Sequence, residues 1–388
     1  MADNPLLRLR EFGQSVWYDN IERGLMLSGE LAEMVERDGV VGVTSNPTIF
    51  QKAVAGSDHY DATIKELAGS EISTDRIVDT IIVQDISMAA DVLKPVFDQT
   101  DSLDGWVSIE VPASMAFDTE KTLLEVERLR SLVDRPNALV KIPATVEGVD
   151  AIRRSIARGY SINVTLIFSI DRYREVMEAY LAGLEQLIER REAGENLPEP
   201  ASVRSVASFF VSRVDTKVDK RLDEQLAQTE DEERRRHLQS LKGQAAVDNA
   251  RLAYQVFQET FSGERWERLA AAGARVQRPL WASTSTKNPD YRDVLYVEEL
   301  IGPDTVNTMP QNTLDDFREH GEVRGNTVLE GVDEAGSRLK ALAEAGVDMA
   351  EVTAELEVEG VKAFADSHDE MYRAVEGKRR QLAEATAR

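Results

Sequence analysis

Short runs of apolar and β-branched residues alternate along the chain with longer segments of helical periodicity. A short continuous run of this kind, bounded by polar residues, is typical of a buried strand in a parallel sheet. Eight runs fit this description: residues 15–19 (SVWYD), 40–45 (VVGVTS), 106–111 (WVSIEV), 138–142 (ALVKI), 161–166 (SINVTL), 206–211 (VASFFV), 278–283 (RPLWAS) and 305–309 (TVNTM). Each is followed by a plausible helix, so strands and helices are expected to alternate.

Strand–helix alternation predicts a parallel sheet, and eight units favour an α/β fold closed as a (β/α)8 TIM barrel. Sheet closure is not visible in a sequence, so an open doubly wound sheet is the alternative. We expect a single barrel domain over residues 1–388, with helical insertions at about 51–105 and 215–277 and a helical tail at about 313–388. The apolar stripes of these helices are interpreted as packing surfaces, and the sequence leaves open whether the tail covers the mouth of the barrel.

Composition narrows the class of protein. The 388 residues are 42% hydrophobic, which suits a soluble globular chain with a sizeable core. Lys and Arg number 46 against 70 Asp and Glu, and the net charge of −24 argues against a nucleic-acid or anionic-membrane surface. The absence of cysteine excludes disulfides and thiol nucleophiles. No signal-peptide core or membrane-length apolar run is present, so a cytoplasmic location is expected.

Several common catalytic motifs are missing. The sequence has no P-loop, dinucleotide fingerprint, nucleophile elbow or zinc-binding HExxH. Its four histidines lie in polar helical surroundings and are interpreted as surface residues. Acid–base chemistry is therefore expected to fall on carboxylates and a lysine.

Polar residues recur at the carboxyl ends of the predicted strands, where barrel enzymes carry their reacting groups. One such residue in a buried strand is commonly a core hydrogen-bonding group. A polar residue at nearly every strand end, with one lysine and two carboxylates among them, favours a functional site. The set comprises Asp19, Asn46, Glu110, Lys141, Asn163, Thr165, Ser208, Arg213 and the segment from Ser283 to Lys287.

Lys141 is the most informative of these residues, because it interrupts an apolar strand that Pro143 ends. Taken alone, the position is compatible with a lysine whose ammonium reaches solvent. An amine in apolar surroundings instead loses its proton more readily, so it can attack a ketone and form a Schiff base. The iminium then accepts electrons from a neighbouring carbon–carbon bond. Glu110 and Asp19 are available for the proton transfers that such a cycle requires.

Five segments carry a resemblance to the transaldolase family. They are GVTSNPTIF (42–50), VKIPATVEG (140–148), INVTLIFS (162–169), SFFVSRVD (208–215) and RPLWASTSTKNPDYRDVLYVEELIGPDTVNTMP (278–310). The resemblance spans roughly residues 10–312 in the expected order. The last segment and the long insertions are most similar to the longer bacterial subgroup.

The resemblance implies a (β/α)8 barrel with class I Schiff-base chemistry and no metal or organic cofactor. The implied reaction moves a dihydroxyacetone unit within the pentose phosphate pathway. The donor is sedoheptulose 7-phosphate or fructose 6-phosphate, and the acceptor is glyceraldehyde 3-phosphate or erythrose 4-phosphate. Sugar phosphates are thus the expected partners of a monomer or homodimer, with no nucleic acid or membrane.

The resemblance also implies roles for the catalytic residues. Lys141 matches the Schiff-base lysine, and Asp19 matches the acid/base that deprotonates the hydroxyl beside the bond to be cleaved. Glu110 matches the carboxylate that acts through a water during carbinolamine dehydration. Thr165 matches the residue that holds this water.

Further residues match substrate contacts of the family. Asn46 and Asn163 correspond to asparagines that bind the three-carbon unit, and Ser208 corresponds to a serine that contacts its terminal hydroxyl. Phe210 would line the pocket. Arg213 would bind the phosphate, which agrees with the bidentate geometry of a guanidinium.

The segment STSTKNP, residues 283–289, is the least certain match. Ser285 and Lys287 are placed where shorter relatives have a serine and an arginine, although the loop can be aligned two residues differently. A lysine there supplies charge without the fork geometry of arginine. Lys287 is also the rival to Lys141 as imine former, and we rank it lower because a loop lysine is expected to lack apolar walls.

Two other functions compete with transaldolase. A fructose 6-phosphate aldolase is a sister activity that releases free dihydroxyacetone, but those enzymes are short and lack a glutamate at the third-strand position of Glu110. A catalytically silent barrel that binds sugar phosphates or a protein is the other alternative. It predicts loss of Lys141, Asp19 or Glu110, and all three are present.

Overall fold

The computed structural model describes residues 4–68 and 72–386 and shows a closed barrel of eight parallel strands that follow one another in chain order. The strands are β1 Gln14–Tyr18, β2 Val40–Val43, β3 Trp106–Glu110, β4 Ala138–Pro143, β5 Ile162–Ile167, β6 Ser205–Phe210, β7 Gln277–Ala282 and β8 Thr305–Met309. Each lies within two residues of its predicted position. The predicted TIM barrel is confirmed and the open-sheet alternative is wrong.

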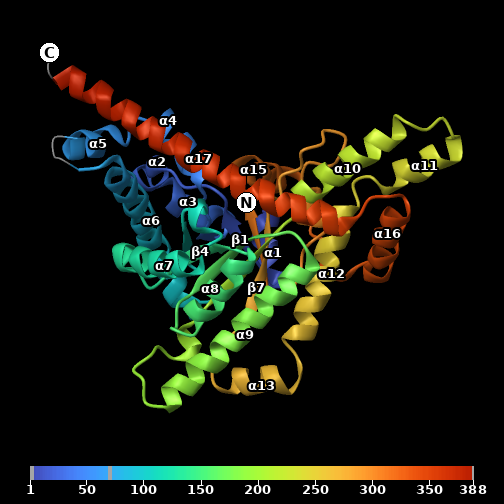
Figure 1. Cartoon of the computed structure of the whole chain (residues 1–388), viewed down its shortest axis with the longest axis horizontal. Coiled ribbons are helices and arrows are strands. Elements are labelled where there is room, and N and C mark those ends of the chain that lie inside the picture. Colours follow the sequence, from blue (N-terminus) through green and yellow to red (C-terminus); the bar gives the residue numbers. More distant parts are fainter. Residues whose placement is uncertain (1–3, 69–71, 387–388) are drawn as a thin grey trace.

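Helices surround this barrel and extend from it (Figure 1). The first half of the chain contributes α1 Pro5–Leu9, α2 Arg23–Ser28, α3 Glu30–Asp38, α4 Pro47–Gly56, α5 Asp61–Ala68, α6 Thr74–Gln99, α7 Thr119–Val133, α8 Val146–Ile156 and α9 Ile170–Glu192. The second half contributes α10 Ser212–Leu226, α11 Glu232–Leu241, α12 Ala245–Thr260, α13 Gly263–Ala271, α14 Leu295–Glu298, α15 Gln311–His320, α16 Val332–Glu344 and α17 Met349–Thr386. Short 3-10 turns occupy Arg10–Phe12, Ala113–Met115, Pro200–Ser202 and Thr327–Leu329.

The segments predicted as insertions and tail are largely helical. Residues 51–105 contain most of α4 and all of α5 and α6, and residues 69–71 of this segment lie outside the described part of the chain. Residues 215–277 contain most of α10 and all of α11 to α13. The tail contains most of α15 and all of α16 and α17, and its residues 387–388 lie outside the described part.

The strand register places three of the predicted site residues side by side. Glu110 of β3 is the register partner of Lys141 in β4, and Lys141 is in turn the partner of Asn163 in β5. Register partners in a parallel sheet project to the same face. The neighbouring strands therefore carry a carboxylate, an amine and an amide in one layer of the barrel interior, near its carboxyl end.

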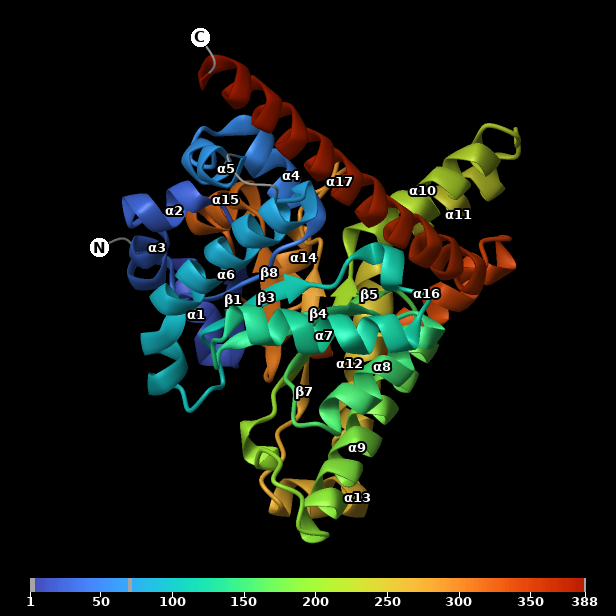
Figure 2. The ribbon, with the colours of Figure 1, turned by 60° about the vertical axis from the view of Figure 1, so that its left-hand side comes forward.

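The long helix α17 crosses the barrel at the carboxyl ends of the strands and packs against α4 and α5 (Figures 1 and 2). Its buried side chains include Val361, Phe364 and Met371, as expected for a packing face. Gly360 permits the close approach, since a Cβ there would lie 2.9 Å from the side chain of Leu166 in β5. The tail therefore covers the mouth of the barrel, a choice that the sequence left open.

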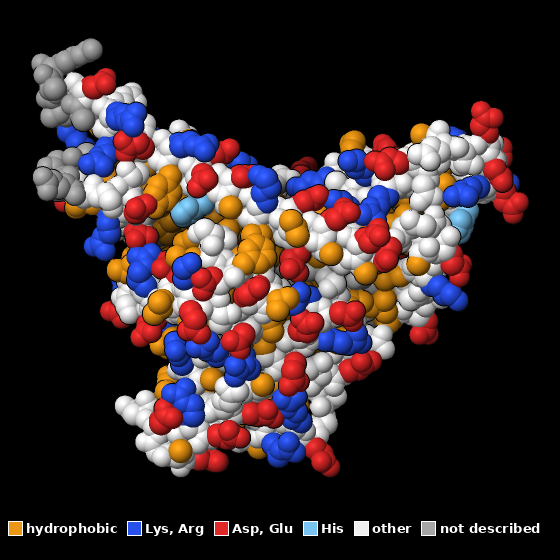
Figure 3. All heavy atoms as spheres, viewed as in Figure 1, with side chains coloured by type: hydrophobic (Ala, Val, Ile, Leu, Met, Phe, Trp, Pro, Cys, Tyr) orange, Lys and Arg blue, Asp and Glu red, His pale blue; other side chains and the backbone are white. Residues whose placement is uncertain are grey.

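The surface is rich in charges of both signs. On the face shown in Figure 3, acidic and basic side chains are interspersed rather than separated into large patches of one sign. Ion pairs tie α17 to its neighbours: Lys217 of α10 contacts Glu355 and Glu359, and Lys378 of α17 contacts Asp61 of α5. Among the helices described here, none combines the length and apolar character needed to cross a membrane.

Candidate active site

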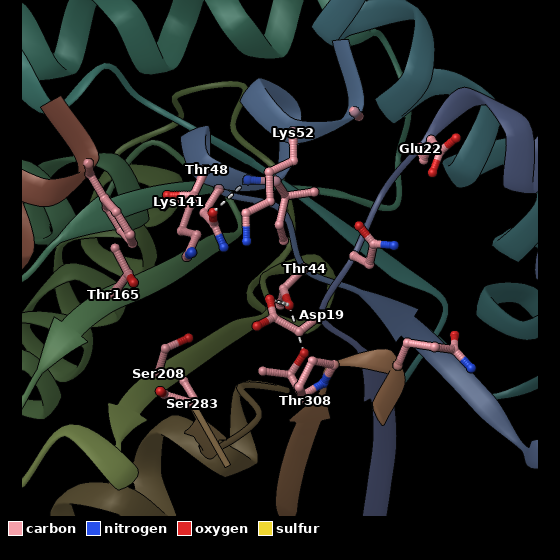
Figure 4. A pocket seen from close by; sticks show the side chains of 18 of the residues that line it. Asp19, Glu22, Thr44, Thr48, Lys52, Lys141, Thr165, Ser208, Ser283 and Thr308 are labelled. Atoms are coloured by element: carbon pink, nitrogen blue, oxygen red, sulfur yellow. Dashed lines mark hydrogen bonds between the residues drawn. The ribbon is translucent and has the colours of Figure 1, made fainter. Parts of the chain in front are cut away.

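A cavity of about 600 Å³ opens at the carboxyl ends of the strands, beneath α17 (Figure 4). This is the end at which barrel enzymes bind their substrates, and the volume suits a small metabolite. The predicted site residues that line it are Asp19, Asn46, Lys141, Thr165, Ser208, Phe210 and Arg213. Glu110, Asn163, Ser285 and Lys287 lie outside this lining. The cavity thus gathers residues that five strands and the segments after them contribute.

Lys141 is buried in the floor of the cavity. Its Nζ lies 3.2 Å from Oε2 of Glu110 and donates a hydrogen bond of 3.2 Å to the carbonyl oxygen of Ser45. Both side chains of the ion pair are only 5% exposed. The ring of Phe364 lies 5.6 Å from Nζ. The surroundings of the Lys141 amine are therefore not purely apolar, in contrast to the expectation from the sequence, because a carboxylate and a carbonyl oxygen also contact it.

Asp19 follows β1 and reaches the same cavity. Its Oδ1 accepts a hydrogen bond of 2.8 Å from Thr44, whose hydroxyl also lies 2.6 Å from that of Thr308 (Figure 4). Burial raises the pKa of Asp19 above its ordinary value of 3.8, and Lys141 opposes this effect through its positive charge. A carboxylate with a raised pKa accepts and returns protons closer to neutral pH than an exposed aspartate does.

Glu110 contacts Lys141 but does not line the main cavity. Burial raises its pKa above 4.5, while Lys141 acts in the opposite direction. Glu110 and His368 of α17 both line a separate cavity of about 40 Å³. His368 is half-buried, and burial lowers its pKa. The interpretation of all four histidines as surface residues is therefore wrong for His368, because α17 folds back over the barrel.

Asn163 and Ser208 form a hydrogen-bonded pair across β5 and β6. The hydroxyl of Ser208 donates to Oδ1 of Asn163 over 2.8 Å, and Nδ2 of Asn163 donates to the hydroxyl of Ser108 over 3.0 Å. Ser208 lines the cavity, whereas Asn163 is fully buried behind it. In this arrangement Asn163 orients Ser208.

Thr165 lies next to an irregularity in β5. The register between β5 and β6 shifts after Val164, and Leu166 has a positive φ of 59°. Bulges commonly redirect side chains beside active sites. The hydroxyl of Thr165 is buried and has no hydrogen-bond partner among the described residues. It is therefore free to bind a water or a substrate hydroxyl, which is the requirement of its predicted role.

Arg213 stands at the start of α10, directly after β6. Its guanidinium lies 5.0 Å from the ring centre of Phe210 and 6.0 Å from that of Phe364. No carboxylate pairs with it within residues 4–68 and 72–386, and burial lowers its pKa. A guanidinium held between two aromatic rings, with its fork unpaired, is well suited to bind an anion.

The carboxyl group of Asp215 anchors the helix that carries Arg213. Its Oδ1 accepts from the backbone nitrogen of Ala246 over 2.7 Å, and its Oδ2 accepts from the hydroxyl of Tyr296 over 2.9 Å. Burial raises the pKa of Asp215 to about 7. The sequence analysis assigned no role to this residue.

The raised pKa of Asp215 predicts a pH-dependent stability. The folded state holds the proton up to about pH 7, whereas the unfolded chain releases it near the ordinary value of 3.8. This stabilisation is present at low pH and is lost as the pH rises through about 7. We expect the wild type to lose about 2 kcal/mol between about pH 5.5 and 8.5 from this group, and Asp215→Asn to lack that loss. Urea denaturation of both proteins at the two pH values measures the free energy of unfolding. An equal change of this free energy with pH in the wild type and in Asp215→Asn would contradict the assignment.

The loop after β7 brings one of its serines to the cavity and keeps the other behind the lining. Ser283 lines the cavity with a positive φ of 57°, and its hydroxyl lies 3.0 Å from that of Ser212. Ser285 is buried and accepts a hydrogen bond of 3.3 Å from Asn312, which lines the cavity. The sequence analysis matched Ser285, with an alternative alignment shifted by two residues. In the structure Ser283 lines the cavity, whereas Ser285 does not line it and contacts its lining through Asn312.

Lys287 lies beyond the lining but within electrostatic range of it. Burial lowers its pKa, followed by repulsion from Arg213, while Asp19 acts in the opposite direction. Only part of the side chain is buried, and Lys287 as a whole is exposed. Position also distinguishes the two lysines, because Lys141 lies in the cavity floor beside Glu110.

Sequence reasoning missed several cavity residues. Thr44 and Thr308 support Asp19, and Phe364 and Lys52 line the cavity from α17 and α4. Thr44 was detectable as a further polar residue at a strand end. Phe364 and Lys52 carried no such signal, because both lie on amphipathic helices whose orientation only packing decides.

A closed parallel barrel with a polar cavity at the carboxyl ends of its strands defines a TIM-barrel enzyme. The sequence model of the family Transaldolase/Fructose-6-phosphate aldolase matches residues 16–375. Transaldolase from Thermobifida fusca is 51% identical over 368 residues, covering 95% of this chain and 96% of that protein. Transaldolase from Mycolicibacterium paratuberculosis is 48% identical over 387 residues, or 99% of each chain. The chain belongs to the transaldolase/fructose-6-phosphate aldolase family, which confirms the resemblance.

Proposed function

We propose that this chain is a transaldolase that transfers a dihydroxyacetone unit through a Schiff base on Lys141. The observation that carries the proposal is the contact of 3.2 Å between Nζ of Lys141 and Glu110, with Asp19 in the same cavity. An amine between two carboxylates of raised pKa has the groups that imine chemistry needs. The names of the relatives support the transferase class.

The first half-reaction uses both carboxylates. The amine of Lys141 attacks the C2 ketone of fructose 6-phosphate to give a carbinolamine. Glu110 then transfers a proton, through a water held by Thr165, to the carbinolamine hydroxyl, which leaves as water. The resulting iminium withdraws electrons from the C3–C4 bond. Asp19 takes the proton of the C4 hydroxyl, the bond breaks, and glyceraldehyde 3-phosphate departs. The three-carbon unit stays on Lys141 as an enamine.

The second half-reaction reverses these steps with another aldehyde. The enamine carbon attacks erythrose 4-phosphate, and Asp19 returns its proton to the new hydroxyl. Water then hydrolyses the iminium, which frees Lys141 and releases sedoheptulose 7-phosphate. Asn46 and Ser208 are proposed to hold the hydroxyls of the three-carbon unit, with Asn163 orienting Ser208. Phe210 lines the pocket and Arg213 is proposed to bind the phosphate.

The reaction needs no further chemical group from a metal or organic cofactor, and we propose none. The proposed partners are sugar phosphates alone. The proposed location is the cytoplasm, and the proposed assembly is a monomer or homodimer.

Borohydride trapping tests the proposal. The protein is reduced in the presence of fructose 6-phosphate, and the adduct is located by intact mass and peptide mapping. We expect one three-carbon adduct on Lys141. An adduct on Lys287 would keep the class of reaction and move the site, and no adduct on folded protein would refute the Schiff base.

A second measurement separates transfer from the sister aldolase activity. Free dihydroxyacetone is followed with fructose 6-phosphate as the only substrate, and then with erythrose 4-phosphate added. A transaldolase turns over only with the acceptor. Sustained release of dihydroxyacetone without it would identify an aldolase.

A further inference from the structure

Lys52 is a cavity residue that the proposed chemistry does not use. It lies on α4, the helix that follows β2, and lines the cavity together with Asn46, Thr48 and Ile49 of the same segment. Figure 4 shows its side chain pointing from the helix into the cavity. The sequence analysis named no residue of α4 beyond its first turn as part of the site.

Lys52 has no ionic partner among the residues that the structure describes. Lys65 and Lys220 likewise form no ion pair in the described part of the chain, but neither of them lines the cavity. Other lysines of the surface helices, such as Lys94, Lys217 and Lys378, contact carboxylates at 2.6 Å. An ammonium that points into a cavity without a counter-ion is available for an anionic ligand.

Two further cations converge on the same region. Arg213 lines the cavity without a carboxylate partner in the described part of the chain. Burial lowers the pKa of Lys287, and repulsion from Arg213 and, to a smaller extent, from Lys52 acts in the same direction. The repulsion of Lys287 by Arg213 and by Lys52 is unfavourable by itself. Such an arrangement is expected where a dianion binds and turns the repulsion into attraction.

We propose that Lys52 is a phosphate-binding residue, and that it shares the terminal phosphate of the sugar with Arg213 and Lys287. This rests on the proposed function, because the sugar is anchored at its other end on Lys141. The interaction is an ionic contact between the ammonium of Lys52 and the phosphate, and this contact requires no further group. The proposal adds a binding contact from α4 to those assigned on β6 and in the loop after β7.

The guanidinium of Arg213 and the ammonium of Lys52 together suit sugar phosphates of different chain length. The three-carbon unit is always fixed at Lys141, so the phosphate of sedoheptulose 7-phosphate lies one carbon further away than that of fructose 6-phosphate. Arg213 is a planar group held between two rings, whereas Lys52 has a flexible four-carbon stem. Lys52 therefore lets the pocket hold phosphates at both distances.

Substitution of Lys52 by methionine tests the proposal, because methionine keeps the length and apolar body of the side chain. With sedoheptulose 7-phosphate as the donor, the transfer reaction is measured with glyceraldehyde 3-phosphate and with unphosphorylated glyceraldehyde as acceptors. For Lys52→Met we expect kcat/KM to fall about tenfold or more with the phosphorylated acceptor, the range for one lost hydrogen bond to a charged group. The unphosphorylated acceptor should change by less than about twofold. Lys52→Arg should restore part of the loss.

Lys65→Met is the matched control, since Lys65 is exposed on α5 and does not line the cavity. It should leave both acceptors unaffected. Equal losses with both acceptors in Lys52→Met, or no loss with either, would overturn the phosphate role.

A binding measurement keeps this inference separate from the proposed reaction. Inorganic phosphate is titrated calorimetrically into the wild type, Lys52→Met and Lys65→Met. We expect affinity to fall about tenfold or more only in Lys52→Met. If the wild type binds phosphate in this way but transfers no three-carbon unit, the proposed function fails while the site stands. If transfer is normal and Lys52→Met binds phosphate like the wild type, the inference fails alone.

Discussion

Lys141→Arg is expected to lower transaldolase activity by about 10⁴-fold or more, because a guanidinium stays protonated and cannot form an imine. Arginine retains a positive charge beside Glu110, so the buried carboxylate keeps a partner and the fold should persist. The measurement combines steady-state transfer from fructose 6-phosphate with borohydride trapping. Both signals should disappear, while the far-ultraviolet circular dichroism spectrum and urea midpoint show a folded protein.

Lys287→Met is the companion variant. Lys287 is the rival to Lys141 as imine former, and burial lowers its pKa. We expect Lys287→Met to keep the three-carbon adduct on Lys141 and to lose affinity for phosphorylated substrates only. Residual trapping in Lys141→Arg that vanishes in Lys287→Met would reverse the assignment of the two lysines.

Asp19→Asn is expected to separate imine formation from bond cleavage. Asparagine is nearly isosteric and can still accept the hydrogen bond that Thr44 donates, but it cannot take the proton of the C4 hydroxyl. Cleavage should slow by about 10²- to 10⁴-fold, the usual contribution of one acid–base group. Fructose 6-phosphate should then be trapped intact, so the adduct on Lys141 carries six carbons instead of three.

Glu110→Gln is expected to affect a different step from Asp19→Asn, namely the formation of the Schiff base. Glu110 is proposed to act during carbinolamine dehydration, so its replacement should slow the appearance of any adduct, of three or six carbons. Asp19→Asn should form its adduct at a nearly normal rate. A three-carbon adduct in Asp19→Asn at the wild-type rate would contradict the role of Asp19.

The raised pKa of Asp19 adds a pH dependence to the same experiment. Its carboxylate must be ionised to accept the hydroxyl proton, so cleavage is lost as the pH falls through this pKa. Because burial raises the pKa above 3.8, the acid limb of the kcat profile should lie above the range of an exposed aspartate. That limb should be absent from the residual activity of Asp19→Asn.

The catalytic layer could be predicted from strand patterns because neighbouring barrel strands bring their carboxyl ends to one place. A polar residue at the end of an apolar run is visible in the sequence, and this criterion found Lys141, Glu110 and Asp19. The structure brings Lys141 into contact with Glu110 and places Asp19 in the same cavity, as that argument required. Their catalytic roles stay predictions that the variants above test.

The same criterion failed where a site residue belongs to a helix or a loop. Phe364 has the periodicity of a packing residue and is one, yet it also lies over the ammonium of Lys141. Ser283 and Ser285 are separated by one residue, and only the backbone turn at Ser283 decides which of them faces the cavity. Sequence spacing does not contain this information, because loop conformation is not periodic.

The sequence by itself determined the eight strands, the family and the lysine with its two carboxylates, and it favoured a barrel whose closure the structure shows. These depend on local apolar patterning and on residues adjacent to strand ends, so they are encoded over short distances. Only the tertiary structure decided that α17 covers the cavity, that His368 is half-buried near Glu110, and that Lys52 joins Arg213 at the same pocket. Each of these depends on contacts between segments far apart in the chain, where side-chain packing rather than sequence pattern selects which face of a helix meets the barrel.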